Sequence, residues 1–229
     1  MEHDEAFVRE VDENLRRDQT EEWFKKNAPL IAGALLLFLA AVAGFLYWKD
    51  RQNKAAAADT ETLVAAAEDS IGNRPKAADT KLAGIVDSSS EGVATQAKLL
   101  RAGNLITQGN RSAAIAIYDE VAKDSSIAQP FRDLATIRSV TAQFDMLKPE
   151  EVVSRLADLA KPESAWFGSA GEVTAMALLK QGKKDEAGRL FAAIASNKDV
   201  PVTIRSRAVQ IAGTLGVDAT AAIADISKG

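Results

Sequence analysis

The chain has 229 residues, a formal net charge of −4 and no cysteine. The absence of cysteine excludes disulfides, thiolate metal sites and thiol nucleophiles. The length allows one domain of ordinary size with smaller appendages. Apolar residues make up 47% of the chain and aromatic residues only 6%, and alanine is abundant. This composition favours closely packed helices, and no stretch alternates long enough to predict a strand, so we expect an all-α fold.

Residues 1–26 form a predicted acidic cytoplasmic tail. They carry nine acidic and five basic residues, and Phe7, Val11 and Leu15 are spaced as on one face of a helix. The pattern predicts a short helix that leads into the next segment. The only histidine, His3, lies in this tail, where we expect no catalytic or metal-binding role.

Residues 27–48 are predicted to form a transmembrane helix, because no charged residue interrupts the run PLIAGALLLFLAAVAGFLYW. A helix of about 20 residues extends about 30 Å, which matches the hydrocarbon core of a bilayer. Trp23 precedes the run, Tyr47 and Trp48 close it, and lysine and arginine residues lie just outside both ends. Such an arrangement is typical of the interfacial belt of a spanning helix.

A cleaved signal peptide is the alternative, since the small residues at 41–43 resemble a cleavage site. Two observations favour a retained anchor: the segment ahead of the apolar run is acidic, and the apolar run continues past residues 41–43. Five basic residues precede the run within the tail, and three follow it closely: Lys49, Arg51 and Lys54. The positive-inside tendency places the N-terminus in the cytoplasm and the C-terminal domain outside, which in a bacterial inner-membrane protein is the periplasm.

The part after the anchor is predicted to consist of helix pairs. Residues 49–90 form a helical linker with the first pair, one helix over 49–71 and a second over 76–87, separated at Gly72-Asn73. Residues 91–229 are predicted to form a tetratricopeptide-like repeat domain.

Two segments of this domain share the order helix, tight turn, helix. Their turns, at Gly109-Asn110 and Gly182-Lys183, allow the two segments to be aligned. The alignment superposes Ala102 on Ala175, Leu105 on Leu178, Ala114 on Ala187, Tyr118 on Phe191 and Val121 on Ile194. Small residues at the close approach of paired helices, with an aromatic residue four positions on, resemble the tetratricopeptide repeat. We therefore expect a helical solenoid, although a plain helical bundle has similar spacings.

The other predicted pairs match the repeat less well. Between the two segments lies a degenerate pair that turns at Lys148-Pro149, where Leu156 and Leu159 replace the aromatic and the later apolar residue. A last pair, over about 201–213 and 217–227, would cap the stack, because terminal repeats must cover an otherwise exposed apolar face.

No catalytic motif is present, because the chain lacks G-x-S-x-G, a P-loop and H-E-x-x-H. The acidic pairs at 150–151 and 185–186 begin predicted helices, where carboxylates offset the helix dipole. The part after Trp48 carries 23 basic and 23 acidic residues, so it has no surplus to neutralise phosphates. We expect a protein that is not an enzyme, with no catalytic, cofactor or metal site, no nucleic acid and no small-molecule substrate.

The predicted binding surface is the groove that the first helices of such repeats line, which suits extended chains or helices. The repeat register predicts five groove residues: Leu99, Gly103, Ile106, Met176 and Leu179. Trp166 and Phe167 are predicted to lie in a loop beside Pro162 and Gly168. Packing in the core is favoured for this pair over a role as an aromatic anchor for a partner.

The whole layout resembles the YfgM-like family, the ancillary subunit of the bacterial SecYEG translocon. The resemblance is carried by the membrane exit LYWKDRQNKAAAA and by WFGSAGEVTAMALLKQGKKDEAGRLF. The tail AGTLGVDATAAIADISKG and the degenerate middle repeat depart from it. The resemblance implies a periplasmic tetratricopeptide-like domain that binds translocon subunits, a periplasmic chaperone or exported chains. A scaffold for envelope or division machinery, or a regulator acting through the cytoplasmic tail, remains the alternative.

Overall fold

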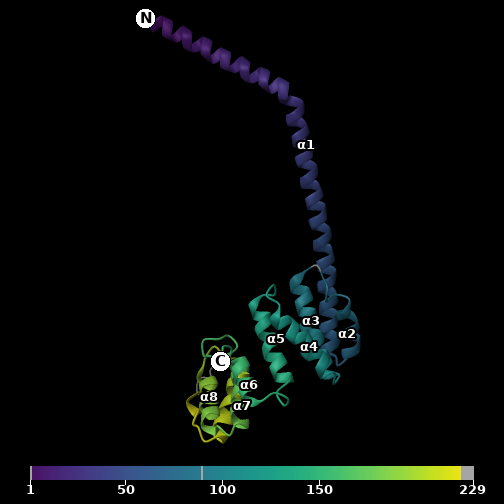
Figure 1. Ribbon diagram of the computed structural model, residues 1–229, viewed down its shortest axis with the longest axis vertical. Helices are drawn as coiled ribbons and strands as arrows, with labels where there is room; N and C mark the ends of the chain where they lie inside the picture. Colours follow the sequence, from purple (N-terminus) through teal and green to yellow (C-terminus); the bar gives the residue numbers. More distant parts are fainter. Residues whose placement is uncertain (1, 89, 223–229) are drawn as a thin grey trace. The chain divides into compact units, whose positions relative to one another are not determined.

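The computed structural model describes residues 2–88 and 90–222, with the side chains of residue 23 and of 25 onward within those ranges. The described residues form nine α-helices and one 3₁₀ helix and contain no strand, which confirms the all-α prediction (Figure 1). In chain order these are α1 (Glu2–Ile71), α2 (Pro75–Ala83), α3 (Glu91–Thr107), α4 (Arg111–Lys123), α5 (Gln129–Ala142), α6 (Pro149–Leu156), α7 (Phe167–Lys180), α8 (Lys184–Ser196), α9 (Val202–Thr214) and η1 (Thr220–Ala222).

The chain divides into two compact units, Met1–Ala55 and Ala56–Gly229. The first unit holds most of α1, and the stretch Lys25–Ile71 of that helix contains a segment long and apolar enough to cross a membrane. Its large apolar side chains are exposed, including Leu37 and Phe38. A contiguous apolar surface of this kind marks contact with a membrane or a partner.

The second unit has its core in a series of small clusters, each between neighbouring helices. One cluster joins the end of α1 to α2 and α3, the next joins α3 to α4 and α5, a third joins α5 to α6 and α7, and the last joins α7 to α8, α9 and η1. From α2 to α9 successive helices contact each other, and α3 also contacts α5, α5 contacts α7, and α7 contacts α9. This nearest-neighbour packing is the architecture of a solenoid.

The sequence alignment of the two repeats is confirmed by burial. The alanines and the paired aromatic and aliphatic positions lie in the core: Ala102, Ala114, Tyr118 and Val121 in one cluster, and Ala175, Ala187, Phe191 and Ile194 in another. Leu156 of the degenerate pair is also fully buried. Removing these side chains from water supplies the main stabilisation of each pair.

The turns of the two aligned repeats have the same backbone geometry. Gly109 and Gly182 have φ of 81° and 76°, a left-handed conformation that favours glycine. After each glycine an amide donates back into the preceding helix, from Asn110 to the Leu105 carbonyl at 2.8 Å and from Lys183 to the Leu178 carbonyl at 3.0 Å. This bonding satisfies helix-end carbonyls and reverses the chain in both repeats.

Two predicted helices differ from the observed ones. The helix over 76–87 ends at Ala83, because the chain turns tightly there and the Ile85 amide donates to the Leu82 carbonyl. The helix over 217–227 does not begin at Val217. Instead the Asp218 carboxylate accepts hydrogen bonds from the Thr220 amide and hydroxyl, which offers the backbone an alternative to the helix. Only η1 follows, and residues 223–229 lie outside the described part.

Candidate functional site

The largest apolar hollow of the second unit among those described lies between α1, α3 and α5, and we call it the N-terminal groove. Its volume is about 600 Å³, within the range of ligand pockets. It is lined by Leu63, Val64, Ala67, Gln96, Leu99, Leu100, Gly103, Tyr118, Phe131, Leu134 and Arg138. On α3 and α5 the lining residues recur at the spacing of one helix face, so three helices present apolar stripes to one open space.

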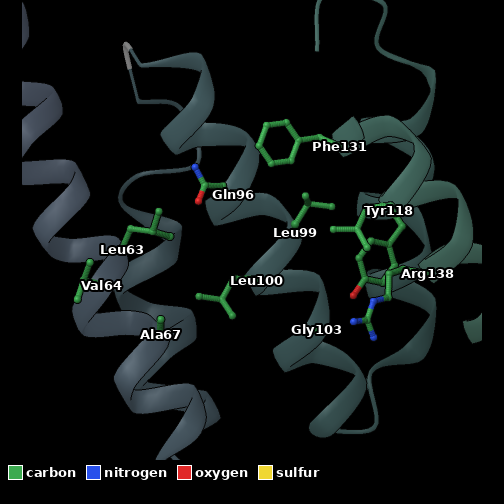
Figure 2. A pocket seen from close by; sticks show the side chains of 11 residues that line it. Leu63, Val64, Ala67, Gln96, Leu99, Leu100, Gly103, Tyr118, Phe131 and Arg138 are labelled. Carbon is green, nitrogen blue, oxygen red and sulfur yellow. The ribbon is translucent and has the colours of Figure 1, made fainter. Parts of the chain in front are cut away.

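Tyr118 and Arg138 give this groove a polar side. Figure 2 shows Leu99 at the centre, with Leu63 and Leu100 across from Phe131, Tyr118 and Arg138. Tyr118 is only 5% exposed, and burial raises the pKa of its hydroxyl, while the nearby Arg138 charge opposes that rise. The phenol therefore stays protonated at neutral pH and keeps its hydrogen to donate.

A second hollow of about 440 Å³ lies between α5, α7 and α9, and we call it the C-terminal groove. It is lined by Thr141, Phe144, Asp145, Glu172, Val173, Met176, Phe191, Arg207 and Ile211. Arg207 donates to both oxygens of Glu172 at 2.7 and 2.6 Å, and this bond raises the pKa of the guanidinium. Lys180 pairs with Asp145 at 2.9 Å and lies over the Phe144 ring.

The predicted groove residues are divided among these features. Leu99 and Gly103 line the N-terminal groove, and Met176, 44% exposed, lines the C-terminal groove. Ile106 is 37% exposed on α3 but is absent from the lining of both grooves. Leu179 is half-buried and packs against the C-terminal core.

Of the pair predicted to lie in a loop, Trp166 lies in the turn before α7 and Phe167 lies in the helix. Phe167 begins α7 and is 2% exposed within the C-terminal core, so no partner can reach it. Trp166 caps the same helix and packs, half-buried, against the cluster between α5 and α7. Phe167 therefore packs in the core and is not an aromatic anchor for a partner, because its ring fills the space between α7 and the neighbouring helices.

Several groove residues were missed by sequence reasoning. Leu63, Val64 and Ala67 lie in the part of α1 that was predicted as a helical linker with the first helix pair, and Phe131 and Arg138 come from the degenerate repeat. The available signal was the i, i+4 spacing of Leu63 and Ala67, which repeats in Leu99 and Gly103 on α3.

The polar groups near the grooves have no arrangement that implies a reaction. Among the described residues no group of three or more acidic or histidine side chains could hold a metal ion. Where the pKa of an aspartate is lowered, the main cause is a hydrogen bond from a neighbouring side chain, as with Lys161 beside Asp158 or Ser126 beside Asp124. What the geometry can do is bury apolar side chains of another molecule.

Stacked helix pairs with grooves between their first helices define a helical repeat scaffold, a class that is typically non-enzymatic and binds proteins. Residues 21–211 match the tetratricopeptide repeat-like domain family, and the chain belongs to that family. The match covers the apolar run as well as helices α2 to α8 and most of α9. The comparisons with curated proteins and with solved structures gave no match.

Proposed function

We propose that this protein is a membrane-anchored adaptor that binds protein segments in its N-terminal groove. The observation that carries the proposal is the apolar groove on α1, α3 and α5, in a chain that also has a helix long and apolar enough to cross a membrane. An anchor confines the groove to the membrane surface, which raises its effective concentration near a membrane partner.

The proposed topology places the N-terminus in the cytoplasm and the repeat domain in the periplasm of a bacterial inner membrane. It is supported by the excess of lysine and arginine ahead of the apolar run. The proposed partners are translocon subunits, a periplasmic chaperone and exported chains, with a chaperone-like role in protein export. This choice rests on the resemblance to the YfgM-like family at the membrane exit and around Trp166.

Filling the groove tests the proposal. A Cβ at Gly103 would meet only the Tyr118 hydroxyl, at 3.7 Å, so Gly103→Leu places a side chain in the groove without displacing the backbone. Gly92→Leu is the matched control, because Gly92 is on the same helix and a Cβ there meets nothing within 4 Å. Tagged full-length variants would be purified from gently solubilised membranes and their partners identified by mass spectrometry.

The expected result is recovery of translocon subunits or a periplasmic chaperone with the wild type and Gly92→Leu, and their loss with Gly103→Leu. Recovery of the same partners with Gly103→Leu would overturn the groove as the binding site. Recovery of envelope-assembly proteins in place of the translocon would replace the export role with a scaffold role.

A further inference from the structure

We propose that the N-terminal groove recognises an amphipathic α-helix whose apolar face ends in an aspartate or glutamate side chain, with Tyr118 and Arg138 as the receptors of the carboxylate. The inference rests on the proposed function, since it names the chemistry of the partner that the same groove binds.

The first observation is the Tyr118 hydroxyl. The residue is only 5% exposed and lines the groove, and no hydrogen bond to its hydroxyl is found within the described side chains. The oxygen is not one of the fully buried atoms that lack a partner, so it is open to the groove. A phenol hydroxyl that is open to the groove can donate its hydrogen to a bound molecule. The neighbouring residue Gly103 has no side chain, so the space beside the Tyr118 hydroxyl stays open.

The second observation is the charge of Arg138. Arg138 is exposed on α5, and no ion pair or hydrogen bond to its guanidinium is found among the side chains that the structure describes. Its charge is near enough to Tyr118 to oppose the rise that burial causes in the pKa of the phenol. The guanidinium and the phenol hydroxyl are two donors on one side of an otherwise apolar groove (Figure 2). Arginine binds carboxylates through two parallel hydrogen bonds, and a phenol adds a third donor.

The rest of the lining favours a helix as the occupant. The walls are helices whose backbone groups are already bonded within each helix, so the groove offers no sheet edge to an extended strand. Leu63, Leu99 and Phe131 instead present branched and aromatic side chains to an open space of about 600 Å³. A leucine-rich helix face with i, i+3 and i+7 anchors matches such a surface.

The experiment uses the full-length protein in lipid nanodiscs and a fluorescein-labelled helical peptide of about 18 residues, long enough to form a helix. One face of the peptide carries leucines at helical spacing and ends in a glutamate, and a twin peptide has glutamine there. Affinities are measured by fluorescence anisotropy for the wild type, Arg138→Gln, Tyr118→Phe and Gly103→Leu. Arg189→Gln is the matched control, since Arg189 is exposed on α8 and outside both grooves.

The glutamate peptide is expected to bind the wild type and Arg189→Gln about tenfold more tightly than its twin, since a hydrogen bond to a charged group contributes about that factor. The preference should vanish in Arg138→Gln and shrink in Tyr118→Phe, and Gly103→Leu should abolish binding of both peptides. Equal affinities of the two peptides for the wild type, with binding still lost in Gly103→Leu, would overturn the carboxylate inference and leave groove binding intact. Failure of both peptides to bind the wild type would overturn both.

Discussion

The two grooves occupy equivalent places in the stack but differ in how their charges are compensated. In the C-terminal groove each charged side chain of the lining already has a partner: Glu172 holds Arg207, and Asp145 holds Lys180. In the N-terminal groove Arg138 and the Tyr118 hydroxyl have none within the described side chains. The same repeat geometry therefore yields one groove with satisfied polar groups and one whose polar groups are available to a partner.

Two glycines of the C-terminal part of the stack are closely packed, whereas Gly103 in the N-terminal groove is not. A Cβ at Gly168 would lie 2.7 Å from a Val200 methyl carbon, and one at Gly188 would lie 2.6 Å from a Val217 methyl carbon, so these glycines allow close packing. At Gly103, by contrast, a Cβ would point into the open groove. The C-terminal part of the stack thus uses small residues for packing, and the N-terminal groove uses one to stay open.

The largest expected effect is on the stability of the C-terminal core. Phe191→Ala should lower the free energy of unfolding by about 3–5 kcal/mol, because the ring is fully buried and its removal leaves a cavity. Tyr118→Phe, at the aligned position, removes a hydroxyl without a partner and should change it by less than about 0.5 kcal/mol. Urea denaturation followed by circular dichroism measures both, and a large loss in Tyr118→Phe would show that the hydroxyl stabilises the fold.

Gly168→Ala and Gly103→Ala should have effects of opposite sign. The first forces a methyl group against Val200 and should cost about 1–3 kcal/mol of stability. The second adds a good helix former where nothing obstructs it and should gain about 0.5–1 kcal/mol. Melting temperatures of the two variants against the wild type test this, and destabilisation by both would contradict the difference between the regions.

Asp69 should make the join between α1 and α2 sensitive to acid. Lys81, at 2.8 Å, and Arg74 both donate to its carboxylate, and these bonds lower the pKa of Asp69 from its ordinary value. A lowered pKa in the folded state means that the stabilisation is complete above the unfolded pKa and is lost as the pH falls through the folded one.

Thermal unfolding followed from neutral pH to below pH 3.8 tests the Asp69 contribution. The wild type should lose stability in the acidic part of this range, whereas Asp69→Asn should be less stable at neutral pH and lose less on acidification. Asp124 also has a lowered pKa, so some acid dependence should remain in the variant. Identical pH profiles of the two proteins would show that the ion pairs at Asp69 do not stabilise the join.

Only a small loss of stability is expected from Glu172→Gln at the C-terminal groove. The pair with Arg207 is partly exposed, so its loss should cost only about 0.2–1 kcal/mol. High salt should reduce this difference, because the pair is accessible to screening ions. Chemical denaturation at low and at high salt measures it, and a cost of several kcal/mol would place the pair among the main supports of α7 and α9.

Much of the fold could be predicted from the sequence, because the repeat places small and aromatic residues where helices meet. Tyr118 and Phe191 were aligned by spacing alone, and both are buried. The segment 217–222 could not be predicted in this way, because its alanine-rich sequence fits a helix, whereas the Asp218 side chain bonds the local backbone instead.

Only part of the candidate site could be predicted from the sequence, because the repeat register places residues on one helix and not between helices. Leu99 and Gly103 follow from the repeat register, but the register gives no hint that α1 supplies a wall of the same groove. Whether Arg138 has a counterion depends on residues far from it in sequence, which only the folded chain brings near. Sequence patterns find the face of a helix, and the tertiary structure decides which polar groups on that face remain unpaired.

The most direct test of the N-terminal groove as a docking site is photo-crosslinking in living cells. A photoreactive amino acid would replace Leu99, which lines the groove, or Ala116, which is exposed on α4 and outside it. Specific protein adducts are expected from position 99 and not from position 116, and Gly103→Leu should suppress them. The same adducts from both positions, or adducts from position 116 alone, would contradict binding in this groove.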